Sequence, residues 1–126
     1  LWKTGKMWFQ VPETVKIVLK NRLSEGVFAK DLALWIKGIL SELDVNGQAI
    51  EYHGEGVSSL SIDDRMTIAN ISTEMGVISS AFPPDDRLAD YFNEPAVRGV
   101  WADEEAVYSR FIEIDLASVF PMVYDT

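Results

Sequence analysis

Residues 61–82 read SIDDRMTIANISTEMGVISSAF, a stretch in which a helix is followed directly by a short strand. Ser61 with Asp64 three residues later resembles a capping box, which marks the start of a helix. Gly76 is suited to the position just past a helix end, because glycine adopts the left-handed conformation there at no steric cost. The small residues of 77–82 then predict a strand, which a pair of prolines ends.

The rest of the chain alternates strands with helices in the same way. Apolar and polar residues alternate over 15–20, as in a half-buried strand, and apolar residues recur at helical spacing over 30–43. The predicted order is strand 15–20, helix 30–43, strand 49–53, helix 61–76, strand 77–82, helix 85–92 and strand 111–116. Strands that alternate with helices indicate parallel pairing. We therefore expect an α/β fold, a three-layer α/β/α sandwich with a mainly parallel sheet, formed by residues 1–126 as a single domain.

Composition excludes several kinds of function. The 126 residues include no cysteine, which excludes disulfides, thiolate metal ligands and a cysteine nucleophile within this chain. The net charge is −9, and nucleic-acid binding depends on Lys and Arg that neutralise phosphates, so we expect no nucleic-acid partner. No apolar run approaches the roughly 18 residues of a membrane span, so we expect no membrane partner.

The charge is unevenly distributed along the chain. Residues 1–40 carry seven Lys or Arg and three Asp or Glu, whereas residues 41–126 carry four Arg and seventeen Asp or Glu. The basic first third is compatible with an anionic substrate or an acidic partner, and also with solvated lysines on a surface strand and helix.

The helix of residues 61–76 carries a polar stripe between two apolar sides. Its members are Asp63, Thr67, Asn70 and Glu74, spaced four, three and four residues apart. Apolar residues on both sides of the stripe predict a helix packed between layers. Spacing alone leaves two interpretations of the stripe open: a solvated surface line, or a carboxylate and an amide presented together to a cleft, where the carboxylate could exchange protons.

Other candidate sites are weaker. His53 is the only histidine, so it is expected to be an ordinary residue at a strand end, and we expect no metal site in this chain. The acidic clusters at 63–64, 85–86 and 103–105 are expected to lie at helix N-termini, where carboxylates are favourable. The segment 54–56, Gly-Glu-Gly, is too short for a phosphate-binding loop. Trp35 is expected in the core.

Five segments resemble the aconitase superfamily, in family order. DDRMTIANISTEMGVISSAFPPD is similar to the family signature R-M-T-I-x-N-M-x-x-E-x-G-A, although Val77 stands where the family has alanine. TGKMWFQVPETVKIVL, EGVFAKDLALWI and AIEYHGEGVSSLSIDDR resemble three further family stretches. FIEIDLASVFPMV is similar to the strand that precedes the first cluster-binding cysteine. The likeness covers residues 1 to about 123 and looks closest to fungal-type homoaconitase.

The resemblance implies a function and a role for the polar stripe. Such enzymes are hydro-lyases that interconvert hydroxy acids by dehydration and rehydration at a [4Fe–4S] cluster. By resemblance, Glu74 matches the glutamate that contacts the iron-bound hydroxyl or water and is the expected catalytic residue. Asn70 matches the asparagine beside the cluster. The implied substrate is a tricarboxylic hydroxy acid. The homoaconitase likeness further implies a role in lysine biosynthesis and a location in the mitochondrial matrix.

Much of the family's machinery is not in this sequence. The three cysteine ligands, the D-S-H motif, the serine base and the substrate-binding arginines of the family have no counterparts here. We therefore expect a piece of a longer enzyme, inactive and cluster-free on its own, whose partners are the remaining domains. Two alternatives stay open: a stand-alone, cluster-free binding domain, or a domain of aconitase or isopropylmalate isomerase. Trp2, Trp8 and Phe9 are expected to pack on a neighbouring domain.

Overall fold

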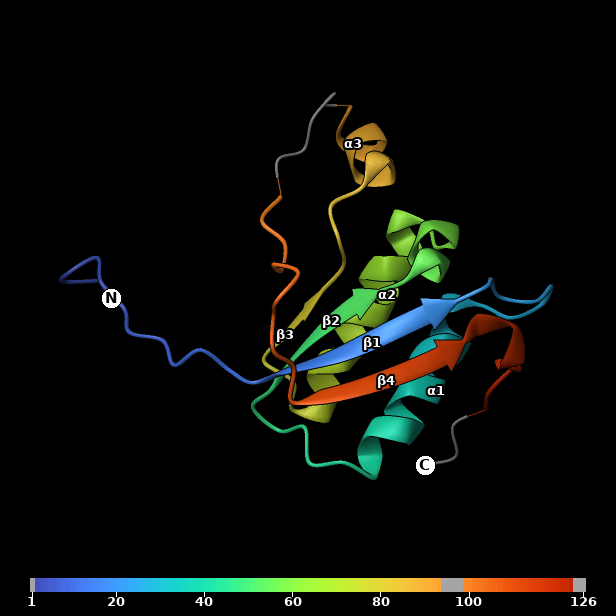
Figure 1. The fold of residues 1–126 in the computed structure, drawn as a ribbon, viewed down its shortest axis with the longest axis horizontal. Helices are drawn as coiled ribbons and strands as arrows, with labels where there is room; N and C mark the ends of the chain where they lie inside the picture. The colour runs from blue at the N-terminus through green and yellow to red at the C-terminus, as the bar shows by residue number, and fades with distance from the viewer. Residues whose placement is uncertain (1, 94–98, 124–126) are drawn as a thin grey trace.

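The computed structural model describes residues 2–93 and 99–123 (Figure 1). Its sheet has four strands in the order β3–β2–β1–β4, and every neighbouring pair is parallel. The strands are β1 (Thr14–Lys20), β2 (Ala49–His53), β3 (Ser79–Ala81) and β4 (Arg110–Asp115), and the α-helices are α1 (Ala29–Ser41), α2 (Ile62–Ser72) and α3 (Asp86–Phe92). Short 3-10 turns lie at η1 (Glu55–Ser59), η2 (Thr73–Met75) and η3 (Leu116–Ser118). The predicted α/β class and the parallel sheet are thus confirmed.

Helices α1 and α2 lie side by side on one face of the sheet (Figure 1). This follows from the topology, because the β1-α1-β2 and β2-α2-β3 crossovers step in the same direction and share one handedness. The opposite face carries the segment 101–108, whose Trp101 and Tyr108 rings lie 5.1 and 5.7 Å from the ring of His53. Within the described ranges, helices therefore cover only one side of the sheet.

The core forms between the sheet and these two helices. In β1, Val15, Ile17 and Leu19 are fully buried while the alternate residues are partly exposed, as the sequence alternation predicts. Buried residues from α1, the other strands and α2 complete one continuous cluster. Full burial of each large aliphatic side chain favours folding by about 1.5–3 kcal/mol before entropy is counted, so this cluster holds the layers together.

The start of α2 has the predicted capping box. The Ser61 hydroxyl accepts a hydrogen bond from the Asp64 amide at 3.1 Å, and the Asp64 carboxylate accepts one from the Ser61 amide at 2.9 Å. The α-helix ends at Ser72, earlier than predicted, because its last turn tightens into η2. Gly76 follows with φ of 74°, the left-handed position predicted for it.

Helix α1 ends at Ser41, two residues before the predicted end, and larger differences from prediction occur at β3 and after β2. Strand β3 is shorter than the predicted 77–82, because it is an edge strand that pairs only with the first three residues of β2. The predicted loop after β2 contains η1, which packs against β1. A Cβ on Gly56 would lie 2.8 Å from the backbone carbon of Leu19, so the close packing of η1 on β1 requires glycine there.

Helix α3 is tied to α2 by an ion pair. Asp85 caps α3 by accepting a hydrogen bond from the Leu88 amide, and its carboxylate also accepts two hydrogen bonds from the Arg65 guanidinium. The acidic clusters at 63–64 and 85–86 therefore lie at helix N-termini as predicted. The prediction is wrong for 103–105, which lies in an irregular segment with a turn.

Candidate functional site

Asn70 and Glu74 lie at the end of α2 and in η2, on the side that faces away from the sheet. Both side chains are exposed, and both line a hollow of about 460 Å³ between α1 and α2. The other lining residues are Lys30, Leu34, Lys37, Thr67 and Ile71. The hollow thus joins cationic side chains from α1 with an amide, a hydroxyl and a carboxylate from the α2 side.

Lys37 of α1 contacts Glu74 directly across the hollow. The Lys37 ammonium donates a hydrogen bond to the Glu74 carboxylate, with Nζ and Oε2 3.1 Å apart. The Glu74 side chain is 61% exposed, so water screens this pair strongly. The Thr67 hydroxyl donates to the Asp63 carbonyl within α2, at 2.9 Å. Glu74 therefore has a cationic neighbour and solvent access, which suits a carboxylate that exchanges protons with a bound molecule.

The structure brings three of the four stripe residues together. Thr67, Asn70 and Glu74 line the hollow, whereas Asp63 does not. The expectation that α2 is packed on two sides is wrong within the described part of the chain. Ile68 is buried against the core, but Met66 is exposed because no layer covers that side. The stripe is therefore a solvent-accessible line of which one part borders a hollow.

Sequence reasoning missed the two lysines of the hollow. Lys30 and Lys37 are seven residues apart, which places them two turns apart on one side of a helix. That spacing was the available signal, but it could not show that the lysine side of α1 would adjoin the polar stripe of α2.

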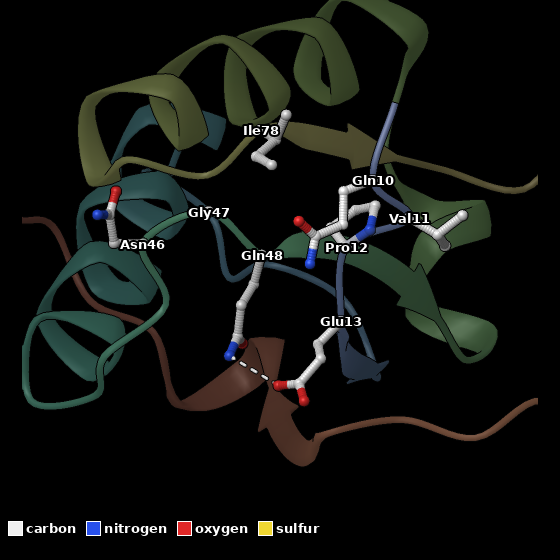
Figure 2. Close-up of a pocket in the computed structure, with 8 residues that line it drawn as sticks. All are labelled: Gln10, Val11, Pro12, Glu13, Asn46, Gly47, Gln48 and Ile78. Atoms are coloured by element: carbon white, nitrogen blue, oxygen red, sulfur yellow. Dashed lines mark hydrogen bonds between the residues drawn. The ribbon is translucent and has the colours of Figure 1, made fainter. Parts of the chain in front are cut away.

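A second hollow, of about 400 Å³, lies at the amino ends of β1 and β2 (Figure 2). Its lining residues are Gln10, Val11, Pro12, Glu13, Asn46, Gly47, Gln48 and Ile78. Figure 2 shows the Gln48 side-chain amide directed at the Glu13 carboxylate, with 3.4 Å between Nε2 and Oε2. The lining includes no cationic side chain, and its one carboxylate already has a partner, so we assign no catalytic role to it.

His53 belongs to a small polar cluster on the face of the sheet opposite α1 and α2. Its Nε2 lies 3.3 Å from the Glu51 carboxylate, which also accepts a hydrogen bond from the Tyr108 hydroxyl at 2.8 Å. Burial, together with the neighbouring Glu51 carboxylate, raises the pKa of Tyr108 to about 12. These contacts hold the 101–108 segment on the sheet, which accounts for the positions of the three side chains.

The described residues do not fit a metal or a cluster. Nowhere in 2–93 or 99–123 do three His, Cys, Asp or Glu side chains gather closely enough to hold a metal ion. The full sequence has no cysteine, the ligand that iron–sulfur clusters take. Within the same ranges, no helix is long and apolar enough to cross a membrane.

Comparison with known proteins identifies the family. Residues 1–125 match the aconitase family, described as aconitate hydratase. The chain is 35% identical to mitochondrial homoaconitase of Debaryomyces hansenii, over 98% of this chain and 21% of that protein. It is 42% identical to the large subunit of 3-isopropylmalate dehydratase of Clostridium kluyveri, over 95% of this chain and 29% of that protein.

A third relative matches the chain with similar identity and coverage. The chain is 37% identical to the large subunit 1 of 3-isopropylmalate dehydratase of Thermotoga maritima, over 94% of this chain and 29% of that protein. The chain thus spans between a fifth and a third of the length of these relatives. Homoaconitases and isopropylmalate dehydratases match it comparably well, so the comparisons identify the family and do not distinguish between these members. This chain belongs to the aconitase family.

Proposed function

We propose that this chain is one domain of a homoaconitase-like hydro-lyase and that it contributes Glu74 and Asn70 to an active site completed by other domains. The observation that carries the proposal is the hollow between α1 and α2, where both residues are accessible beside two lysines. A site built between domains requires catalytic side chains at the surface of each domain. The exposure of Glu74 and Asn70 in this chain is what such a site needs.

The two residues have separable roles in the proposed reaction. Dehydration of a hydroxy acid removes a proton from one carbon and hydroxide from the next, and hydration reverses both steps. Glu74 would exchange a proton with the hydroxyl that leaves or the water that adds. Asn70 would hold that oxygen by donating a hydrogen bond from its amide. The base that removes the carbon-bound proton lies outside this chain in the proposal.

The [4Fe–4S] cluster typical of the family does not fit this chain, since the sequence offers no cysteine. In the proposal the other domains hold the cluster, and this chain binds none on its own. When bound there, it would supply a Lewis acid for the departing hydroxyl. The contribution of this chain is confined to positioning the oxygen and exchanging its proton.

The proposed substrate is a tricarboxylic hydroxy acid, with a place in lysine biosynthesis and in the mitochondrial matrix. The similarity to fungal proteins named mitochondrial homoaconitase supports this assignment. The two lysines of the hollow also suit a substrate rich in carboxylates. Isopropylmalate dehydration is the second candidate, and the Clostridium kluyveri and Thermotoga maritima relatives favour it.

A cluster-free binding domain is the alternative from another functional class. Such a module would cover its aromatic side chains. Instead Trp2, Trp8 and Phe9 are all strongly exposed on a segment that extends away from the sheet (Figure 1). This exposure favours a domain that packs against further domains.

The test is Glu74→Gln in the full-length parent enzyme with its cluster loaded. Hydration of the unsaturated tricarboxylic acid should fall at least about a hundredfold, because the amide cannot exchange the proton. The visible absorption of the cluster should stay unchanged. Asp63→Asn, which makes the same change on the stripe but outside the hollow, serves as the matched control. Full activity of Glu74→Gln would refute the proposed role.

A further inference from the structure

A third hollow, of about 470 Å³, lies at the carboxyl ends of the strands, at the other end of the sheet from the second hollow. It is bordered by the loop after β1, the start of α1, the end of η1 and the starts of α2 and α3. Ligands of parallel α/β sheets bind outside the carboxyl ends of their strands. Glu74 and Asn70 lie elsewhere and are not among its lining residues.

Two arginines from different segments line this hollow. Arg22 follows β1, and its guanidinium has neither a hydrogen bond nor an ion pair among the described residues. Arg87 lies in α3, and its Nε donates to the Ser58 carbonyl at 2.6 Å, while its terminal nitrogens make no hydrogen bond or ion pair in the described part of the chain, although its charge acts on nearby Asp85. Two guanidinium groups thus border the hollow, and both have N–H donors that make no hydrogen bond among the described residues.

The start of α1 adds backbone donors to the same place. Phe28 precedes the helix and offers no side-chain acceptor, and the amides of Ala29 and Lys30 have no acceptor among the described residues. Phe28 and Ala29 both line the hollow. The one carboxylate there, Asp64, is already engaged by the amide and the hydroxyl of Ser61, at 2.9 and 2.7 Å.

We propose that this hollow binds a small organic anion through an oxyanion group, a phosphate or a carboxylate. Arg22 and Arg87 would each donate hydrogen bonds to the oxyanion, since guanidinium groups match the planar or tetrahedral arrangement of such oxygens. The amides at the start of α1 would complete the cradle. The exposed Phe28 ring and the neighbouring Leu23 and Val27 would contact the apolar body of the ligand.

The site is independent of the proposed hydro-lyase function. It would be tested by amide NMR spectra of the ¹⁵N-labelled 126-residue chain during titration with inorganic phosphate and, separately, with succinate. Sodium chloride at equal ionic strength controls for screening. Saturable shifts of the Ala29 amide, which borders only this hollow, are the expected result, and the more effective of the two anions identifies the oxyanion. Shifts confined to the amides of Asn70 and Glu74 would overturn this proposal while leaving the other site open.

Variants separate specific binding from general charge. Arg22→Gln should weaken binding about tenfold, because it removes a charged donor that has no structural partner in the described residues. Lys3→Gln removes the same charge from the exposed N-terminal segment, outside the hollow, and should leave binding unchanged. The spectra themselves report whether each variant is folded. Equal binding by Arg22→Gln and the unmodified chain, or the absence of saturation with both anions, would overturn the proposal.

Discussion

Replacing Asp85 by serine is expected to destabilise the domain by about 3 kcal/mol, because it leaves a buried guanidinium without its counter-charge. Arg65 is only 4% exposed, and it donates to the two Asp85 carboxylate oxygens at 2.9 and 2.5 Å. Its Nη2 also donates to the Val57 carbonyl at 3.1 Å. Serine still provides an acceptor for the Leu88 amide, so Asp85→Ser preserves the cap of α3. The measured loss of stability then reports the loss of the ion pair alone.

The magnitude follows from the unequal burial of the two partners. Removing one partner of a buried pair costs about 3–5 kcal/mol, and we take the lower end because the Asp85 side chain is 29% exposed, which lets water approach Arg65. Arg65→Met should cost less, about 1–2 kcal/mol, since water can solvate the carboxylate that remains. The double variant should be close to Arg65→Met, because no unpaired buried charge is left.

Urea unfolding followed by far-ultraviolet circular dichroism gives the free energies. Asp86→Ser is the matched control, because Asp86 is the exposed neighbour in the first turn of α3 and its loss should change stability by less than about 0.5 kcal/mol. Equal destabilisation by Asp85→Ser and Asp86→Ser would refute the reasoning. The reasoning would also be refuted if Arg65→Met lowered the free energy of unfolding as much as Asp85→Ser does.

The same pair predicts a pH dependence. Hydrogen bonds from Arg65, followed by weaker contributions from the Leu88 amide and nearby positive charge, hold the pKa of Asp85 below its ordinary value despite partial burial. A lowered pKa contributes stability above the pKa of the unfolded state, about 3.9, and that stability is lost as the pH falls through the folded-state pKa. Asp85→Ser should therefore lose less stability than the unmodified chain between neutral pH and pH values below about 4.

Three further predictions concern the core, a close contact and the exposed aromatic residues. Ile17→Ala should lower the free energy of unfolding by about 2–5 kcal/mol, because Ile17 is fully buried in the central strand; a loss below about 1 kcal/mol would contradict the core described here. Gly56→Ala should destabilise by more than about 1 kcal/mol, measured by urea unfolding, since its Cβ would lie 2.8 Å from the Leu19 backbone. Replacing Trp2 and Trp8 by phenylalanine should shift the remaining tryptophan emission to shorter wavelengths, because both side chains are exposed; an unchanged emission maximum would show that they are covered.

Local sequence signals predicted the elements well where one segment carries all the information. Strand β2 has the predicted bounds, and the capping box of α2 and the left-handed Gly76 occur as expected. Each depends on residues within a few positions of one another. The short β3 was mispredicted because the length of an edge strand depends on its neighbour, which local pattern does not reveal.

The candidate site was predictable only in part. The spacing of Asn70 and Glu74 placed them on one line of a helix, and the family resemblance suggested their roles. Which side of α2 would meet the core depends on how α1 and α2 pack together, so the exposure of the stripe and its proximity to Lys30 and Lys37 emerged only from the structure. The apolar residues on both sides of the stripe favoured packing between two layers, and the described chain supplies only one.

The central claim is that this chain serves as one domain of a larger hydro-lyase. The most direct measurement is the mass of the natural gene product in its source cells, detected with an antibody raised against this domain. The account predicts a band several times larger than the 14.1 kDa of this chain. A band near 14.1 kDa would contradict it, because a chain without cysteine could not supply the cluster ligands, and Asn70 and Glu74 would then serve a different site.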